Sequence, residues 1–113
     1  MSETGIQQQI RLALGSCPGV KMFRNNVGAY KDPTGRVIRY GLFVGSADLI
    51  GWRTVTITPD MVGQSLAQFV SVEVKTPTGR LSPEQETWQV AVQKAGGIAV
   101  VARSVDDISF LVA

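Results

Sequence analysis

The segment from residue 66 to residue 102 constrains the fold more than any other part of the chain. Residues 66–76 have the composition of a strand, residues 83–95 have apolar side chains at helical spacing, and residues 98–102 form a short apolar run. Strands joined through a helix are typically parallel, with a right-handed crossover. We therefore expect a strand–helix–strand unit whose last strand is buried on both faces.

The two longer helices carry clear start signals. Ser82 is a predicted N-cap, Pro83 takes the first helical position, and Gln85 stands where a capping box needs a glutamine. A first helix is predicted over residues 3–14, with Ser2 as its cap and Glu3 in the first turn, where the helix dipole favours an acid. Glu3 shares a face with Gln7 and Ile10 in that helix, so it could point inward or act on the dipole alone.

Strands are also predicted before this unit, over residues 19–27 and 49–57, with a short further one over 36–40 after the turn at 31–35. These segments are close in sequence, which favours an antiparallel meander. The whole chain, residues 1–113, is thus expected to be a single α/β domain. Its mixed central β-sheet would be flanked by helices, in the order α-β-β-β-α-β.

Composition excludes several chemistries. The chain of 113 residues has no histidine, which excludes Ser-His-Asp and Cys-His catalysis and makes a zinc site improbable. The single Cys17 cannot form an internal disulfide. Net charge is +2, but seven of the basic residues and three of the acidic ones lie in residues 1–53, which fits an anionic partner or an ordinary surface. No apolar run suggests a membrane span or a secretion signal, so a cytoplasmic location is expected.

Polar residues on the predicted strand 66–76 suggest a metal site. Side chains alternate along a strand, so Glu73 and Lys75 point one way while Val72 and Val74 are expected to point into the core. Asp48, flanked by glycines, would bring a second carboxylate from a nearby strand. With the Val74 carbonyl, these oxygens suit Mg²⁺ or Mn²⁺, and Lys75 could support an attacking water. This combination suits phosphodiester hydrolysis.

Several other polar residues are candidates for nucleic-acid contact. Arg24, Asn25 and Asn26 place a charge and two amides at a strand end without an apolar reason, although the two asparagines could instead shape a hairpin. Four further basic residues are plausible phosphate contacts or simply solvated charges: Lys31, Arg36, Arg39 and Arg80. Trp52 and Trp88 are expected in the core, and Phe43 in the core, at an interface or as a DNA wedge.

Five segments occur in the order typical of one family: Glu3, residues 24–28, residues 45–51, residues 73–75 and residues 80–85. In this respect the chain resembles the VRR-NUC family of the PD-(D/E)XK nuclease superfamily. The resemblance implies a restriction-endonuclease-like core and a metal-dependent nuclease. It matches Asp48, Glu73 and Lys75 to the catalytic triad, Glu3 to the acid of the N-terminal helix and Gln85 to the glutamine after the triad strand. Ala47 replaces the proline expected before Asp48.

The chain resembles the stand-alone form of the family, found in phages and bacteria. This implies a bacterial cytoplasm, a phage or prophage origin, and a homodimeric endonuclease. The implied substrate is branched DNA such as a Holliday junction, in replication, recombination or repair. Two alternatives stay open: a non-cleaving nucleic-acid-binding protein on the same fold, and a restriction-like nuclease that reads duplex sequence.

Overall fold

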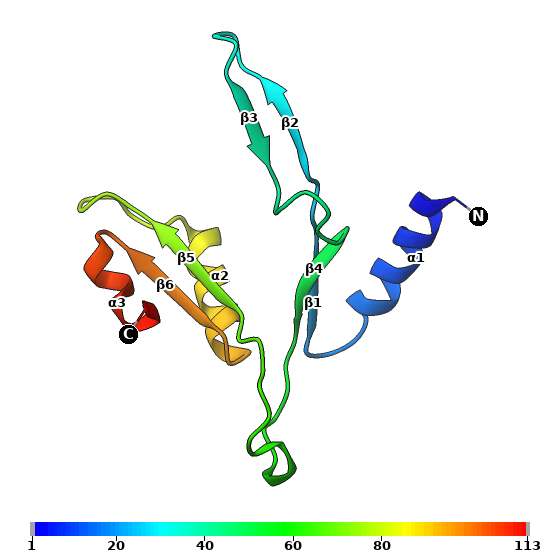
Figure 1. Ribbon diagram of the computed structural model, residues 1–113. Helices are drawn as coiled ribbons and strands as arrows, with labels where there is room; N and C mark the ends of the chain where they lie inside the picture. The colour runs from blue at the N-terminus through cyan, green and yellow to red at the C-terminus, as the bar shows by residue number, and fades with distance from the viewer. Residues whose placement is uncertain (1, 113) are drawn as a thin grey trace. The chain divides into compact units, whose positions relative to one another are not determined.

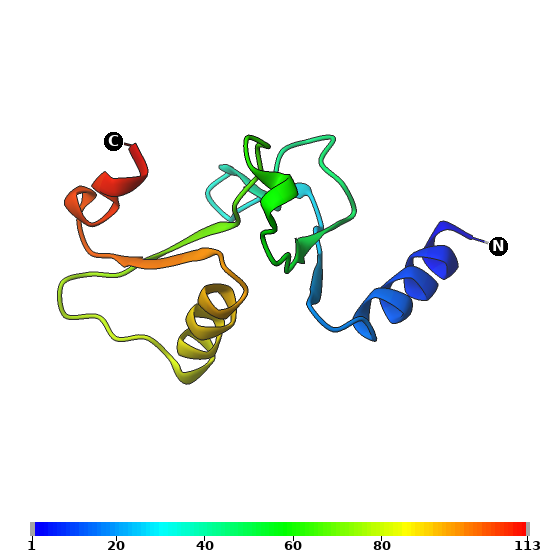
Figure 2. The same cartoon turned by 90° about the horizontal axis from the view of Figure 1, so that it is seen from below.

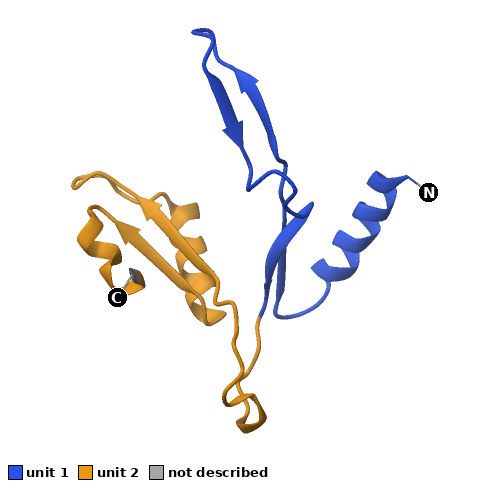
Figure 3. Cartoon of the chain, in the orientation of Figure 1, with its two compact units in different colours: residues 1–53 blue, residues 54–113 orange. Residues whose placement is uncertain are grey.

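The structure, a computed structural model, describes residues 2–112 (Figure 1). The chain divides into two compact units, residues 1–53 and residues 54–113 (Figure 3). Both helices and strands occur, and the strand pairs run both parallel and antiparallel. The expected mixed α/β class is therefore confirmed.

The first unit contains one helix and four strands. Helix α1 (Glu3–Gly15) begins where expected, because the Ser2 hydroxyl accepts a hydrogen bond from the Gly5 amide at 3.1 Å. This helix packs against strand β1. The strands are β1 (Val20–Arg24), β2 (Gly28–Lys31), β3 (Val37–Tyr40) and β4 (Leu49–Arg53).

The strands of the first unit pair two by two, and both pairs are antiparallel, but they do not form the expected meander, because β1 pairs with β4 and not with the next strand in sequence. Strand β1 pairs with β4, and β2 pairs with β3 as a hairpin. Strand β2 was not predicted, because its four residues follow a strand end and contain a glycine. Among the described residues, β2 and β3 contact each other and no further helix or strand. The hairpin therefore extends beyond the β1–β4 pair of its own unit (Figure 1).

The second unit contains the predicted strand–helix–strand. Strands β5 (Val70–Val74) and β6 (Ile98–Ala102) are parallel, and helix α2 (Pro83–Lys94) connects them and covers one face of the pair (Figure 2). Short helical segments complete the unit: η1 (Pro59–Met61), η2 (Val105–Ile108) and α3 (Ser109–Val112). Its core contains Val92 of α2 with Ala99 and Ala102 of β6. No helix within residues 2–112 has the length and apolar character needed to cross a membrane.

The structure corrects two expectations about the strands. The predicted segments 19–27, 49–57 and 66–76 are each longer than the paired strand they contain. Within the second unit Val72 and Val74 do not face a core, since 41% and 77% of their surface is exposed. The reason is that α2 packs on the other face of β5, where Gln85 and Trp88 contact Glu73 and Ser71. The described strands pair two by two, and a continuous central sheet stays a prediction.

Candidate active site

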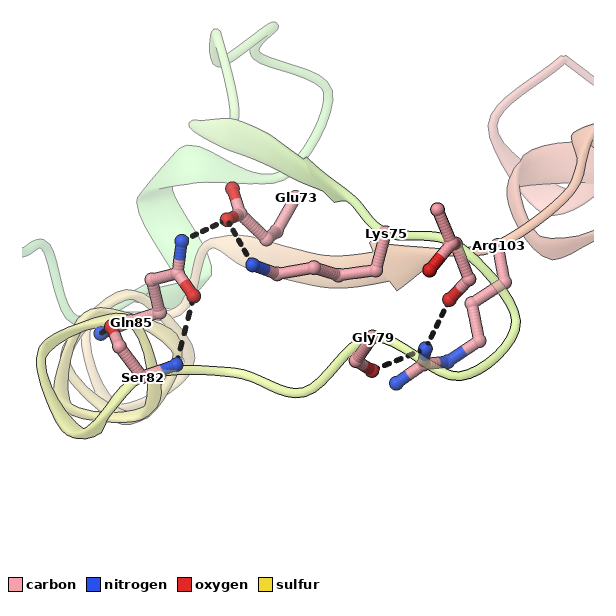
Figure 4. A network of polar contacts seen from close by, with 7 residues as sticks. Glu73, Lys75, Gly79, Ser82, Gln85 and Arg103 are labelled. Carbon is pink, nitrogen blue, oxygen red and sulfur yellow. Dashed lines mark hydrogen bonds and ion pairs between the residues drawn. The ribbon is translucent and has the colours of Figure 1, made fainter.

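Glu73 and Lys75 lie together on the face of β5 that is turned toward α2. The Lys75 Nζ is 3.7 Å from Glu73 Oε1, and the two side chains are 22% and 32% exposed (Figure 4). Both are therefore half-buried but open to a ligand. The prediction that they share a strand face agrees with this geometry.

Gln85 connects the start of α2 to Glu73. Its Oε1 accepts a hydrogen bond from the Ser82 amide at 2.9 Å, while the Ser82 hydroxyl accepts one from the Gln85 amide at 3.1 Å. This is a complete capping box. Because the box holds Oε1 against Ser82, the side-chain Nε2 faces the strand and donates to Glu73 Oε1 (Figure 4). Gln85 thus caps the helix and contacts Glu73, and its role in the site stays a prediction.

A pocket of about 220 Å³ opens between β5 and α2 beside this cluster. Glu73 and Gln85 line it, together with Ser71 and Trp88. The Trp88 indole donates to the Ser71 hydroxyl at 3.0 Å, and its ring packs at an edge against Phe69. The expectation that Trp88 belongs to the core is met in part, because its ring packs while one side lines the pocket.

Arg103 orders the loop that follows Lys75, a role the sequence reading missed. Its Nη1 donates to the carbonyls of Thr76 and Gly79 at 2.6 and 2.7 Å (Figure 4). The signal was present, because Arg103 directly follows the apolar run of β6. In a parallel pair the carboxyl ends of both strands lie at the same edge, so residue 103 is placed near the chain that leaves β5.

Within residues 2–112 no three acidic, histidine or cysteine side chains gather around one point, but the oxygen donors here are of the kind that a hard divalent cation binds. Glu73 Oε1 contacts the Lys75 ammonium and accepts a hydrogen bond from Gln85 Nε2. The other carboxylate oxygen of Glu73 is left for a ligand. The Lys75 amide donates to the Ala102 carbonyl at 3.0 Å. Since successive residues use opposite edges of a strand, the Val74 carbonyl faces the edge of β5 away from β6. Magnesium commonly binds one or two carboxylates and completes its shell with water and substrate phosphate.

Asp48 belongs to the first unit, directly before β4. Its carboxylate is exposed and forms no hydrogen bond or ion pair with any described residue of that unit. Its backbone carbonyl accepts a hydrogen bond from the Asn25 amide at 2.8 Å, which extends the β1–β4 pairing by one step. Asp48 is therefore fixed through its backbone, with a free side chain.

The Arg24–Asn26 segment is ordered by contacts within its own unit. Arg24 Nη2 donates to Asn26 Oδ1 at 3.1 Å. Asn25 donates to Ser46 and Ala47 and accepts from Leu42, so its amide is used inside the protein. Arg24 and Asn26 are exposed. Nucleic-acid contact by these three residues stays a prediction.

The other predicted residues lie on exposed surface. Glu3 is exposed in the first turn of α1, and Arg80 is exposed in the loop before α2. Lys31, Arg36 and Arg39 are exposed on the β2–β3 hairpin. Phe43 is 87% exposed, so it lies outside the core of its own unit, and an interface or DNA contact stays a prediction. Trp52 is half-buried and packs against Phe23, with ring centroids 5.6 Å apart.

These features define a class of protein: a mixed α/β protein with an acid, a lysine and a glutamine gathered at one strand. Residues 25–106 match the family model described as the VRR-NUC domain. Since this match covers most of the chain, the protein belongs to the VRR-NUC family and is a member of a nuclease family. Searches among curated proteins and among solved structures gave no match. The resemblance expected from the sequence is thus confirmed, and the match includes Asp48, Glu73, Lys75 and Gln85 but not Glu3 or Arg24.

Proposed function

We propose that this protein is an Mg²⁺- or Mn²⁺-dependent deoxyribonuclease that hydrolyses phosphodiester bonds with water as the nucleophile. The observation that carries the proposal is that Glu73 on β5 contacts both Lys75 and Gln85, in a chain of the VRR-NUC family. A half-buried acid beside a cation and an amide donor is suited to hold a reactive group in a fixed place.

Each residue has a defined role in this proposal. Glu73, the Val74 carbonyl and Asp48 would hold the metal, which would supply positive charge and lower the pKa of a water. The Lys75 ammonium orients the attacking water and stabilises negative charge on the phosphate. Gln85 fixes the Glu73 carboxylate, and Glu3 assists from α1.

The proposal treats residues 1–113 as one functional domain with a restriction-endonuclease-like core. The family match supports this, because it runs without interruption from residue 25 to residue 106 and so crosses the boundary at residue 53.

DNA contact is assigned to basic and amide side chains of the first unit and to one loop of the second. The pairing of β2 with β3 places Lys31 and Arg39 on one face of the hairpin, and Tyr30 and Tyr40 on the other. Arg36 lies at the turn. A two-stranded ribbon with one basic face can follow a phosphate backbone. The remaining contacts are Arg24, Asn26 and Arg80, whereas the side chain of Asn25 is used by hydrogen bonds within its own unit.

The proposed substrate is branched DNA, such as a Holliday junction, cut during replication, recombination or repair. A homodimer suits such a substrate, because a four-way junction has two-fold symmetry and needs paired nicks. The proposed setting is the cytoplasm of a bacterial cell, with the gene carried by a phage or prophage.

The test is cleavage of end-labelled junctions, flaps and plain duplexes by the wild type and by Lys75→Ala, with Mg²⁺ or Mn²⁺. We expect the wild type to cut and Lys75→Ala to cut on the order of 10²–10³-fold more slowly. Lys94→Ala is the matched control, since it removes a lysine from the last turn of α2. It should cut like the wild type.

Three results would overturn part or all of the proposal. If wild type and Lys75→Ala both bind DNA and neither cuts, the protein is a non-cleaving DNA-binding protein. If a random duplex library is cut at one motif, the protein is a restriction-like nuclease. If the solution mass stays that of a monomer with and without a junction, the dimer is wrong.

A further inference from the structure

The side chain of Asn25 is the centre of a hydrogen-bonded loop that leads to Asp48. Its Nδ2 donates to the Ser46 hydroxyl at 2.7 Å and to the Ala47 carbonyl at 2.9 Å. Its Oδ1 accepts from the Leu42 amide at 3.1 Å. Both amide hydrogens are therefore used, and a single half-buried side chain holds the loop at its start and at its end.

The backbone of Asn25 holds the same loop where it joins the sheet. The Asn25 amide donates to the Asp48 carbonyl at 2.8 Å, one step beyond the pairing of Arg24 with Leu49. Inside the loop the Ser46 amide donates to the Phe43 carbonyl at 2.9 Å and closes a turn. The path from residue 42 to residue 48 is thus fixed by polar contacts at both ends and in the middle.

Apolar packing contributes little to the shape of this loop. Leu42, Phe43 and Val44 are 53%, 87% and 83% exposed. A loop whose large apolar side chains face solvent depends on its hydrogen bonds, each of which contributes about 0.5–1.5 kcal/mol. Replacing the side-chain carboxamide of Asn25 removes three of these hydrogen bonds together.

We infer that Asn25 is a positioning residue that sets the backbone of Asp48 for metal binding. This inference rests on the proposed function, since it assigns Asp48 to the metal. Asn25 acts through the loop and does not touch the metal or the DNA. Groups that orient a metal ligand typically change metal affinity or activity by about 10–100-fold when removed.

The experiment measures Mn²⁺ binding to the protein without DNA, from the electron paramagnetic resonance signal of free Mn²⁺. Asn25→Ala should raise the dissociation constant for Mn²⁺ by about 10-fold or more. The KM for a labelled junction should stay within about twofold of the wild type, and saturating Mn²⁺ should restore most of the cleavage rate. A residue needed only for stability would not give this metal-dependent rescue.

Two further variants keep the test decisive. Ser46→Ala removes one of the three hydrogen bonds and should give a smaller shift in Mn²⁺ affinity. This variant tests the same role if Asn25→Ala does not fold. Gln68→Ala is the matched control, because Gln68 also donates from its amide to a distant loop carbonyl, that of Gly96 at 3.0 Å. Mn²⁺ binding by Gln68→Ala should equal that of the wild type.

Each outcome separates this inference from the proposed function. A wild type that cuts no DNA with Mg²⁺ or Mn²⁺ overturns the proposed function. A wild type that cuts, with Mn²⁺ binding unchanged in Ser46→Ala and in folded Asn25→Ala, overturns the positioning role alone. Weaker junction binding in Ca²⁺ with unchanged Mn²⁺ affinity would make Asn25 a DNA contact and also overturns it.

Discussion

The two acids of the proposed site are held in different ways. Glu73 lies within a regular strand, and its partners are Lys75, the first residue after that strand, and Gln85 in the first turn of α2. Asp48 ends a loop that is shaped by one asparagine side chain and by the glycines within it. The first arrangement repeats local rules of strands and helix caps, whereas the second depends on contacts between residues 17 to 22 positions apart.

This difference indicates which of the two regions keeps its backbone shape when a side chain is substituted. Around Glu73 the backbone is fixed by pairing with β6 and by the capped helix, so a side-chain substitution alters chemistry more than shape. Around Asp48 the shape itself depends on a few polar groups. Substitutions there should act first on the backbone and only then on chemistry.

The largest expected effect comes from removing either carboxylate while keeping its size. Asp48→Asn and Glu73→Gln should each slow junction cleavage on the order of 10³-fold, because each removes a charged ligand of the proposed metal. If both acids serve one step, the double variant should be little slower than either single one. Single-turnover rates of the three variants test this.

Independent, multiplying losses in the double variant would mean that the two acids serve separate steps. A rate for Asp48→Asn close to that of the wild type would remove Asp48 from the site. The Glu73 cluster would then act without it.

The next effect concerns the loop before Asp48, at two glycines with similar backbone. Gly41 and Gly45 have φ values of 81° and 88°. A Cβ at residue 41 would overlap the carbonyl of Asn26, whereas nothing lies within 4 Å of a Cβ at residue 45. Gly45→Ala should therefore cost about 1 kcal/mol of unfolding free energy through φ alone, and Gly41→Ala about 3 kcal/mol.

Urea unfolding followed by circular dichroism measures both glycine variants. Equal losses of unfolding free energy in the two variants would show that the close approach of residue 41 to Asn26 adds nothing to the cost of a Cβ. The loop would then be less tightly held than the Asn25 contacts indicate.

The sequence predicted the second unit better than the first, for a physical reason. The capping box and the strand periods are local signals, and they located α2, β5 and β6 and the parallel pairing. The contact of Gln85 with Glu73 follows from the same box, because the cap turns the amide donor toward the strand. The capping box therefore predicted the start of α2, whereas the sequence connected Gln85 with the site only through the family resemblance.

Two features could not be predicted from local pattern. Alternation along β5 defines two faces but does not say which one α2 covers, and α2 covers the face with Glu73, not the face with Val72 and Val74. The polar partners on α2, Gln85 and Trp88, meet Glu73 and Ser71 instead. The contacts of Asn25 with residues 42–48 were not predicted either, because no sequence spacing links an amide at a strand end to residues in a later loop.

A smaller effect separates capping from site contact in α2. Ser82→Ala and Gln85→Ala each remove part of the capping box, and each should lower stability by about 1 kcal/mol. Only Gln85→Ala also removes the donor to Glu73, so it alone should slow cleavage, by about 10-fold. Thermal melts and cleavage rates of the pair check this. Equal cleavage by the two variants would reduce Gln85 to a cap.

The smallest effect is a pH dependence at the turn of the β2–β3 hairpin. Asp32 Oδ1 accepts from the Thr34 hydroxyl at 2.6 Å and from the amides of Thr34 and Arg36, each at 2.9 Å. The Thr34 hydroxyl, with these amides, lowers the pKa of Asp32 below its ordinary value of 3.8. A lowered pKa means that the turn is stabilised above the unfolded-state pKa and loses this support as pH falls through the folded pKa.

Amide chemical shifts of Thr34 and Arg36, followed from about pH 6 to about pH 2, should therefore move together with a midpoint below the ordinary aspartate value. Asp32→Asn is the control, because its amide cannot titrate and the same shifts should stay flat in that range. A midpoint at or above 3.8 would contradict the contacts that hold this turn. The hairpin would then depend on its β2–β3 pairing and not on the contacts of Asp32.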